Sequence, residues 1–231
     1  MREDIKLSPR LLAICQYIKG ESLADIGTDH GYIPIYLLQK GRIQRAFALD
    51  LRPGPLERAR ENVIRYGLEK RITLGLSNGL RALTPGAVQT ILIAGMGGDL
   101  IVRILEEGRR HFPHTRFFVL SPHTRWEKCR KYLWEQGFVI EEEGMVKDEG
   151  KFYPIIRAVY TGIPVPLPKV RYQKYGRYLV EKRDPVLREY LENRLVKQQK
   201  ILQGFPPSKR EKAEEIEQNI REIKECLDEM Y

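Results

Sequence analysis

Residues 23–37, LADIGTDHGYIPIYL, constrain the fold of this chain more than any other stretch. They begin with an apolar run over 23–26, pass through a turn that contains Gly27 and Gly31, and continue as a second apolar element over 33–38. Glycine permits the backbone angles that a sharp turn needs, so the pattern predicts a buried strand, a tight turn and the start of a helix. In an open α/β sheet such a turn lies at the carboxyl edge, where ligands bind.

Strand-like and helix-like patterns alternate over the first two thirds of the chain. Further strands are predicted at 45–50, 71–76, 88–94 and 116–120, with apolar helical patterns between most of them. This alternation is typical of a parallel sheet covered by helices. The last two strand-like runs, 138–146 and 152–160, are joined by five residues, which forces an antiparallel hairpin because a parallel return needs a longer crossover. We therefore expect an α/β fold with a Rossmann-like, mostly parallel sheet that ends in an antiparallel hairpin.

A proline-rich segment, TGIPVPLP, follows the second strand of that hairpin and marks the expected domain boundary. Three prolines at alternate positions cannot continue a helix or a central strand, so we place one domain at 1–162 and a second at 163–231. In the second, apolar residues recur at three- and four-residue spacing over 187–202 and 213–230, on either side of a turn at 204–208. The pattern predicts two antiparallel helices that form a coiled-coil hairpin.

The net charge of the 231-residue chain is +9, which suits an anionic partner such as nucleic acid. The basic excess is densest over 169–200, where cations alternate with tyrosines. We expect Arg171, Lys174 and Arg177 to contact phosphates of a structured RNA. The alternative is a solvated helix face whose tyrosines pack on the first domain.

Cysteine usage and hydropathy narrow the class of protein further. The three cysteines are isolated, so we expect reduced thiols and neither a metal site nor a disulfide framework. No apolar run is long enough to cross a bilayer and the N-terminus lacks a signal-peptide pattern, which favours a cytoplasmic protein without a membrane partner. The sequence leaves the oligomeric state open, with a monomer favoured.

An acidic residue, Asp50, ends the second predicted strand 19 residues after Gly31. In nucleotide-binding sheets a carboxylate at this point accepts hydrogen bonds from ribose hydroxyls, which predicts an adenosine-containing cofactor. The glycine fingerprint of dinucleotide sites is absent, and Asp29 takes the place of its middle glycine. A carboxylate there would repel a pyrophosphate but attract a sulfonium or amino group, so S-adenosylmethionine is favoured over NAD(P). An ordinary strand–turn–helix with a surface aspartate remains the alternative.

Four motifs together resemble the bacterial tRNA (adenine(22)-N1)-methyltransferase family. They are ADIGTDHGYIP at 24–34, IAGMGG at 93–98, LSP at 120–122 and EGKFY at 149–153. The resemblance extends over the whole chain in order, spacing and overall plan. It implies a class I methyltransferase domain followed by a helical hairpin, with S-adenosyl-L-methionine as cofactor and tRNA as substrate.

The resemblance also implies which residues bind the cofactor. For its methionine end they are Asp25, Gly27, Thr28, Asp29, His30 and Gly31; for the ribose and adenine, Asp50, Leu51, Asn78 and Gly79; and at the later strand end, Ala94, Gly95, Met96 and Gly97. The chain departs from the family pattern at Asn78, where Asp is frequent, and at 121–123, where Ser-Pro-His stands in place of Gln-Pro-Asn.

Methylation of adenine N1 requires in-line placement more than a general base, because N1 already carries an in-plane lone pair. The enzyme must expose the base, stack it and hold its amino group with an acceptor. We assign catalytic roles to Asp29, His123 and Tyr153, and substrate contacts to Tyr32 and Lys151, besides the three cations of the second domain. Packed aromatic residues, a loop histidine and a solvated lysine are the alternatives for these positions.

Three other functions remain open at this point. The first is a methyltransferase of the same fold that acts on another RNA base or on a small molecule. The second is a non-catalytic RNA-binding module, and the third, disfavoured by Asp29, is an NAD(P) oxidoreductase.

Overall fold

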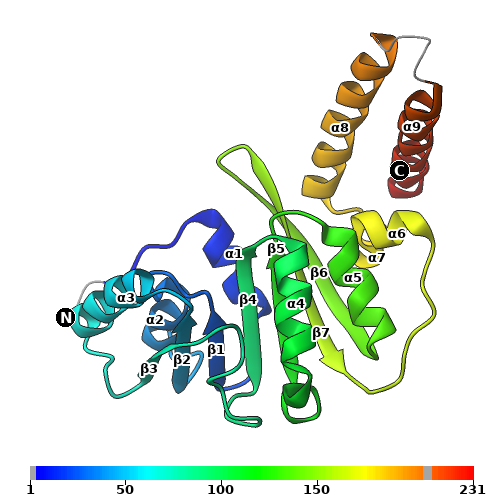
Figure 1. Ribbon diagram of the computed structural model, residues 1–231. Helices are drawn as coiled ribbons and strands as arrows, with labels where there is room; N and C mark the ends of the chain where they lie inside the picture. Colours follow the sequence, from blue (N-terminus) through cyan, green and yellow to red (C-terminus); the bar gives the residue numbers. More distant parts are fainter. Residues whose placement is uncertain (1–3, 205–209) are drawn as a thin grey trace. The chain divides into compact units, whose positions relative to one another are not determined.

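The computed structural model describes residues 4–204 and 210–231, with the side chains of 210 and 211 excepted. The chain divides into two compact units, one that ends at Leu167 and one that runs from Pro168 to Tyr231. Figure 1 shows the strands and their covering helices in the first unit and a set of helices in the second. The division falls within the proline-rich segment.

A seven-stranded sheet with the order β3-β2-β1-β4-β5-β7-β6 forms the centre of the first unit. Its strands are β1 (Ser22–Ile26), β2 (Arg45–Asp50), β3 (Ile72–Leu76), β4 (Thr90–Met96), β5 (Phe117–Pro122), β6 (Phe138–Asp148) and β7 (Lys151–Tyr160). The first five strands are parallel, whereas β7 runs antiparallel to both β5 and β6. This topology confirms the predicted Rossmann-like sheet and its terminal hairpin.

The helices of the first unit cover the sheet. They are α1 (Pro9–Tyr17), α2 (Tyr32–Gln39), α3 (Pro53–Tyr66), α4 (Gly98–Glu107) and α5 (Trp126–Glu135), with a 3₁₀ turn, η1, at Arg109–His114. Apolar residues of α1, α2 and α3 share one core with residues of the central strands, such as Leu23, Leu92 and Val119. Helix α4 packs on β4 and β5, in front of the sheet in the view of Figure 1. β1 is buried along its whole length, and its apolar residues Leu23, Ala24 and Ile26 are the kind that a central parallel strand requires.

The second unit is helical where it is described. Its elements are α6 (Val170–Tyr175), α7 (Arg177–Glu181), α8 (Pro185–Gln203) and α9 (Arg210–Met230). Asp184 caps α8 by accepting hydrogen bonds of 2.9 Å from the backbone nitrogens of Val186 and Leu187. A bond of 3.1 Å from Arg188 Nη2 to the Met230 carbonyl joins the start of α8 to the end of α9, so the two helices are antiparallel. The coiled-coil detail stays a prediction, and 205–208 of the expected turn lie outside the described residues.

Other sequence expectations concern membranes, metals and thiols. Within 4–204 and 210–231, no helix combines the length and the apolar character that a membrane crossing requires. The same ranges contain no group of His, Cys, Asp or Glu side chains that could hold a metal ion. Cys15, Cys129 and Cys226 are buried free thiols.

Candidate functional site

A cavity of ≈ 610 Å³ lies at the carboxyl edge of the sheet, where β1, β2, β3 and β4 end. The chain order reverses beside β1, since β2 and β3 extend the sheet to one side and β4 and β5 to the other. Crevices at such a reversal are where open α/β sheets bind ligands. The expected cofactor residues that line the cavity are Asp25, Gly27, Thr28, Asp29, His30, Asp50, Leu51, Asn78, Gly79, Ala94, Gly95 and Met96.

The other two expected cofactor residues support the cavity from behind. Gly31 is the N-cap of α2 with a φ of 71°, and Gly97 is the N-cap of α4. Neither is among the lining residues of the cavity. Both therefore define where a helix begins beside the site rather than forming its surface.

The turn after β1 is held in an unusual backbone conformation. Gly27, Asp29 and Gly31 all have positive φ, with values of 76°, 48° and 71°. The backbone nitrogens of Gly27 and Thr28 both donate to the Leu49 carbonyl, at 2.7 and 3.1 Å, and so tie the turn to the end of β2. A non-glycine residue with positive φ costs roughly 1–2 kcal/mol, so the surrounding hydrogen bonds maintain Asp29 there.

Asp25 is a buried carboxylate at the end of β1, with 6% of its surface exposed. Its Oδ2 accepts a hydrogen bond of 2.7 Å from the Thr28 hydroxyl. Burial raises the pKa of Asp25 to about 6, and the neighbouring charge of Asp50 adds to this, while the Thr28 hydrogen bond opposes it. A carboxylate with such a pKa is a ready partner for a ligand cation, because a cation would relieve its desolvation.

Asp50 ends β2 next to this carboxylate and is 7% exposed. Its Oδ1 accepts a hydrogen bond of 2.9 Å from the backbone nitrogen of Arg52. Leu51, which follows it, is 65% exposed although it lines the cavity. The carboxylate therefore lies beside an apolar surface, an arrangement that suits a ribose and an attached base.

The end of β4 carries a β-bulge. The register of β4 with β5 shifts between Ala94 and Met96, and Gly95 has a φ of 78°. The Met96 carbonyl accepts a hydrogen bond of 2.8 Å from the backbone nitrogen of His123, which joins this bulge to the segment after β5. Bulges of this kind re-aim backbone groups beside active sites, and here they direct the Ala94–Met96 segment into the cavity.

Asp29 differs from Asp25 in its surroundings. Its side chain is 54% exposed and its Oδ1 accepts a hydrogen bond of 2.6 Å from Arg58 Nη2. His30 Nε2 lies 3.5 Å from Asp29 Oδ2, and the His30 ring stacks on Tyr32 with centroids 4.9 Å apart. The Asp29 carboxylate is therefore already paired with the cationic Arg58 side chain. Asp25, by contrast, accepts no hydrogen bond from a cationic side chain among the described residues.

His123 and Tyr153 lie together at the rim, with ring centroids 5.1 Å apart. His123 lines the cavity, whereas Tyr153 and Lys151 are not among its lining residues. Arg10 of α1 joins this group, since its Nη1 lies 2.8 Å from His123 Nε2 and its guanidinium carbon lies 5.0 Å from the Tyr153 ring centroid. The fold thus brings two of the expected catalytic residues together with an arginine that the motifs did not identify.

The residues assigned to the site from the sequence leave out part of the cavity wall. The additional lining residues are Arg10, Leu11, Ile26, Ile33, Arg52, Ser77, Leu100, Arg103 and Ile104. A signal was available for α4, because that helix begins directly after the IAGMGG motif and must present its first turn to the same edge. No local pattern marks Arg10, which lies 113 residues before His123.

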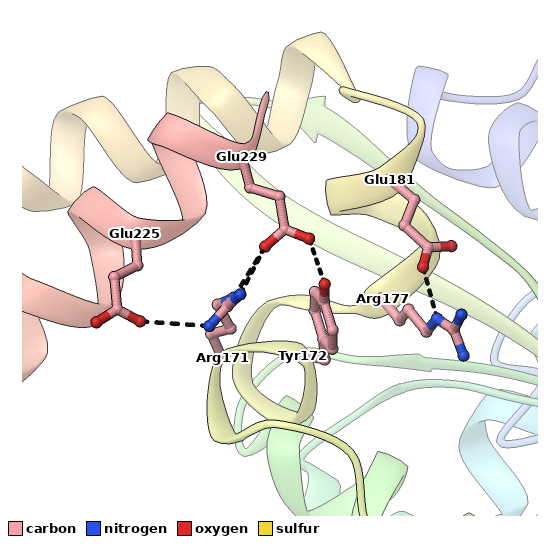
Figure 2. A network of polar contacts seen from close by, with 6 residues as sticks. All are labelled: Arg171, Tyr172, Arg177, Glu181, Glu225 and Glu229. Atoms are coloured by element: carbon pink, nitrogen blue, oxygen red, sulfur yellow. Dashed lines mark hydrogen bonds and ion pairs between the residues drawn. The ribbon is translucent and has the colours of Figure 1, made fainter. Parts of the chain in front are cut away.

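The three cations expected to bind tRNA are engaged in ion pairs within the second unit. The pairs are Arg171 with Glu225 and Glu229, Lys174 with Glu222, and Arg177 with Glu181. Figure 2 shows the pairs of both arginines, together with the Tyr172 hydroxyl that donates to Glu229. Their contact with tRNA stays a prediction, and a phosphate would have to compete with these carboxylates.

Comparison with known proteins gives a consistent result. The family model described as "tRNA (adenine(22)-N(1))-methyltransferase" matches residues 23–225. A curated relative from Bacillus subtilis (strain 168) with the same description is 29% identical over 235 residues, which covers 98% of this chain and 95% of the relative.

Solved structures agree in fold over nearly the full length. A Streptococcus pneumoniae protein, described as a candidate tRNA (m1A22) methyltransferase, has a TM-score of 0.90 at 32% identity and covers 96% of this chain and 100% of its own. The same protein in complex with S-adenosyl-L-methionine has a TM-score of 0.86 over the same shares of both chains. A relative from M. capricolum, solved with S-adenosyl-homocysteine, has a TM-score of 0.86 at 27% identity and covers 97% of this chain and 99% of its own.

Proposed function

Because the chain belongs to the tRNA (adenine(22)-N(1))-methyltransferase family, we propose that its cavity is where S-adenosylmethionine binds and N1 of a tRNA adenine is methylated. The activity itself follows from the family: the protein is an S-adenosylmethionine-dependent enzyme that methylates N1 of an adenine in tRNA, at position 22. What we add is the assignment of residues. The observation that carries it is the pair of buried carboxylates, Asp25 and Asp50, at adjacent strand ends of one cavity.

The residues of the cavity fit the cofactor. Bound there, S-adenosylmethionine would supply an electrophilic methyl group on a sulfonium. Asp25 is buried without a cationic side-chain partner among the described residues, so we assign it to the amino group of the methionine end. Asp50 holds the ribose hydroxyls, and Leu51 with Leu100 and Ile104 forms the apolar wall for the adenine ring.

The target base then belongs on the other side of the β4 bulge. The carbonyl oxygens of Ala94 and Gly95 are the acceptors that we assign to its exocyclic amino group. Tyr32 and His123 line the cavity and orient the base, with Tyr153 behind His123. No side chain has to remove a proton, because the attacking N1 lone pair is already available, and the main contribution of the site is therefore placement.

Binding of tRNA needs a wider surface than the cavity. The net charge of +9 favours a polyanion, and Lys151 lies at the start of β7 close enough to His123 to influence its titration. We assign Lys151 to a phosphate near the target base, and the second unit, including Arg171, Lys174 and Arg177, to positioning of the tRNA. We further propose that the enzyme works in the cytoplasm, because its family acts on tRNA, and that it works as a monomer.

The deciding experiment is nucleoside mass spectrometry of unmodified tRNA after incubation with the protein and labelled S-adenosylmethionine. We expect labelled 1-methyladenosine in the wild-type tRNA and none in a matched transcript with guanosine at position 22. Label in another nucleoside would indicate a different RNA methyltransferase. Absence of label, with no thermal shift on addition of the cofactor, would indicate a non-catalytic binding module.

A further inference from the structure

The contact between Arg10 and His123 determines where the histidine proton resides. Arg10 Nη1 lies 2.8 Å from His123 Nε2, which is hydrogen-bond distance. A guanidinium has donors and no acceptor, and it stays protonated in proteins. His123 Nε2 must therefore accept this bond, and in the neutral ring the proton resides on Nδ1.

Charged and polar groups face His123 from several elements. Arg10 comes from α1, Lys151 and Tyr153 come from β7, and the Met96 carbonyl of β4 holds the His123 backbone. Burial lowers the pKa of His123 below its ordinary value, and the charges of Arg10 and Lys151 lower it further. The ring is thus kept neutral under conditions where an isolated histidine would begin to take up a second proton.

Arg10 itself is fixed by its neighbours. Its guanidinium carbon lies 5.0 Å from the Tyr153 ring centroid, and its backbone nitrogen donates to Asp148 Oδ2 at 3.3 Å. The cation–π contact and the backbone bond hold the arginine against the β6–β7 hairpin. The same arrangement leaves Nδ1 of His123 without a hydrogen-bond partner within the described part of the chain, on a side chain that lines the cavity.

We propose that Arg10 is a positioning residue that keeps His123 neutral, with the Nδ1 proton of His123 available to N3 or N7 of the target adenine, which leaves the N1 lone pair free to attack the methyl group. This inference rests on the proposed function, because it assigns the Nδ1 atom of His123 to a hydrogen bond with the target base. The physical reason lies in the product. Methylation at N1 makes the base cationic, so an imidazolium in direct contact with the base would oppose the developing charge more than the Arg10 guanidinium, which is bound to the other ring nitrogen, Nε2.

The test combines NMR titration of His123 with single-turnover methyl transfer from pH 5 to 8, at S-adenosylmethionine concentrations that saturate the site at every pH, so that titration of Asp25 does not shape the rate profile. In Arg10→Ala the His123 pKa should rise, because a permanent cation and a donor to Nε2 are lost. At pH 8 the methyl-transfer rate should fall about ten-fold, the loss expected for one misplaced hydrogen bond, while cofactor affinity stays unchanged. The acid limb of the rate profile should follow the His123 titration in both proteins.

Arg116→Ala is the matched control. Arg116 also lies over an aromatic ring, 5.0 Å from the Phe117 centroid, but it precedes β5 at the opposite edge of the sheet. It should change neither the His123 titration nor the rate. His123→Asn is the conservative variant, because an amide has one acceptor and one donor group and does not titrate in this range. It should retain most of the activity and lose the acid limb, whereas His123→Ala should lose activity at every pH.

The outcomes separate this inference from the proposed function. If His123 titrates identically in wild type and Arg10→Ala, the positioning role is wrong even if tRNA is methylated normally. If His123→Asn is as inactive as His123→Ala, or retains the acid limb, the assignment of a neutral donor is wrong. If the wild-type protein forms no 1-methyladenosine, the proposed function fails, and with it the base contact, while the NMR result still decides the Arg10–His123 coupling.

Discussion

Asp25 in the first unit and Arg171 in the second differ in how their charges are partnered. In the first unit, Asp25 is buried at the cavity with a hydroxyl as its hydrogen-bond partner, and its pKa is raised to about 6. In the second unit, Arg171 is paired with two glutamates, and its partner Glu229 also accepts from a tyrosine (Figure 2). A charge that lacks a partner is costly unless a ligand supplies one, whereas a paired charge already stabilises its own domain. The difference distinguishes a group poised for a ligand from a group that holds helices together.

The largest effect should come from neutralising the group poised for a ligand. Asp25→Asn should weaken S-adenosylmethionine binding about 100-fold, on the order of 3 kcal/mol, because the amino group of the cofactor loses its buried counter-charge. The unliganded protein should become more heat-stable at pH 7.5, since the cost of the buried carboxylate disappears. Calorimetric titration and thermal unfolding of the same samples measure both.

Asp99→Asn provides the control for this substitution. Asp99 is 60% exposed and paired with Lys128, so the same chemical change removes a surface charge outside the cavity lining. Its cofactor affinity should equal that of the wild type. If Asp25→Asn binds the cofactor normally, or if it destabilises the unliganded protein, Asp25 is a structural residue and the contrast between the units disappears.

The pH dependence of Asp25 gives the next effect. Its folded-state pKa of about 6 lies above the ordinary aspartate pKa of 3.8, so the stabilising contribution of the protonated form is complete below 3.8 and is lost as pH rises through about 6. The difference between these two pKa values corresponds to about 3 kcal/mol, by which Asp25→Asn and wild type should diverge in unfolding free energy between pH 4 and 7.5.

Cofactor affinity should change with pH in the opposite direction. Between pH 7 and 5 the affinity for S-adenosylmethionine should fall, approaching ten-fold per unit below about pH 6, because Asp25 must then release a proton before it can pair with the amino group. Methylthioadenosine lacks that amino group and should bind with little pH dependence. If the affinities of the two ligands change with pH to the same extent, the titrating group is not Asp25.

The predictable part of the fold is the part that local patterns encode. The apolar run and glycines of 23–37 predict β1, its turn and α2, and the short connection between β6 and β7 leaves no alternative to a hairpin. The site was predictable to the extent that parallel strands end at one edge, which brings Asp25 and Asp50 together. Sequence position alone could not place Arg10 beside His123, because that contact depends on how α1 packs.

The same limit applies to the basic segment of the second unit. Its alternation of cations and tyrosines is also what a phosphate-binding surface would show. The partners of Arg171, Glu225 and Glu229, lie more than 50 residues further along the chain, on α9. Nothing in the sequence around these glutamates distinguishes them from glutamates that face solvent. Only the packing of α6 on α9 reveals that the cation is engaged.

A smaller change in stability is expected at Arg171, and it bears on whether this residue stabilises its unit or contacts RNA. Arg171→Gln should reduce the stability of the second unit by about 1 kcal/mol, since the Arg171 side chain is 19% exposed and its Nη2 lies 2.9 Å from Glu229 Oε2. Glu229→Gln should cost a similar amount, because it removes the charge of the same pair and leaves one oxygen to accept from either Arg171 or Tyr172. Thermal unfolding of both variants and of the double variant gives the coupling energy.

Binding of tRNA by these variants then separates structure from recognition. If Arg171 acts through the fold of its unit, both substitutions should weaken tRNA binding to a similar extent. If Arg171 contacts a phosphate, Arg171→Gln should weaken binding while Glu229→Gln strengthens it, because removing the carboxylate frees the cation. Stronger tRNA binding by Glu229→Gln would mean that Arg171 leaves its ion pair to contact RNA.

The smallest effect, and the cleanest to interpret, is expected at Arg177. Its pair with Glu181 spans one helical turn, and both side chains are substantially exposed, at 60% and 42%. Arg177→Gln should therefore change unfolding free energy by less than about 0.5 kcal/mol. Any change in tRNA affinity can then be attributed to the interface, because the fold is unaltered.

The salt dependence of tRNA binding tests whether Arg177 contacts a phosphate. If it does, Arg177→Gln should weaken binding at low salt and reduce the slope of log affinity against log salt by about 1. An unchanged slope would confine Arg177 to the structural role that the ion pairs of its unit suggest.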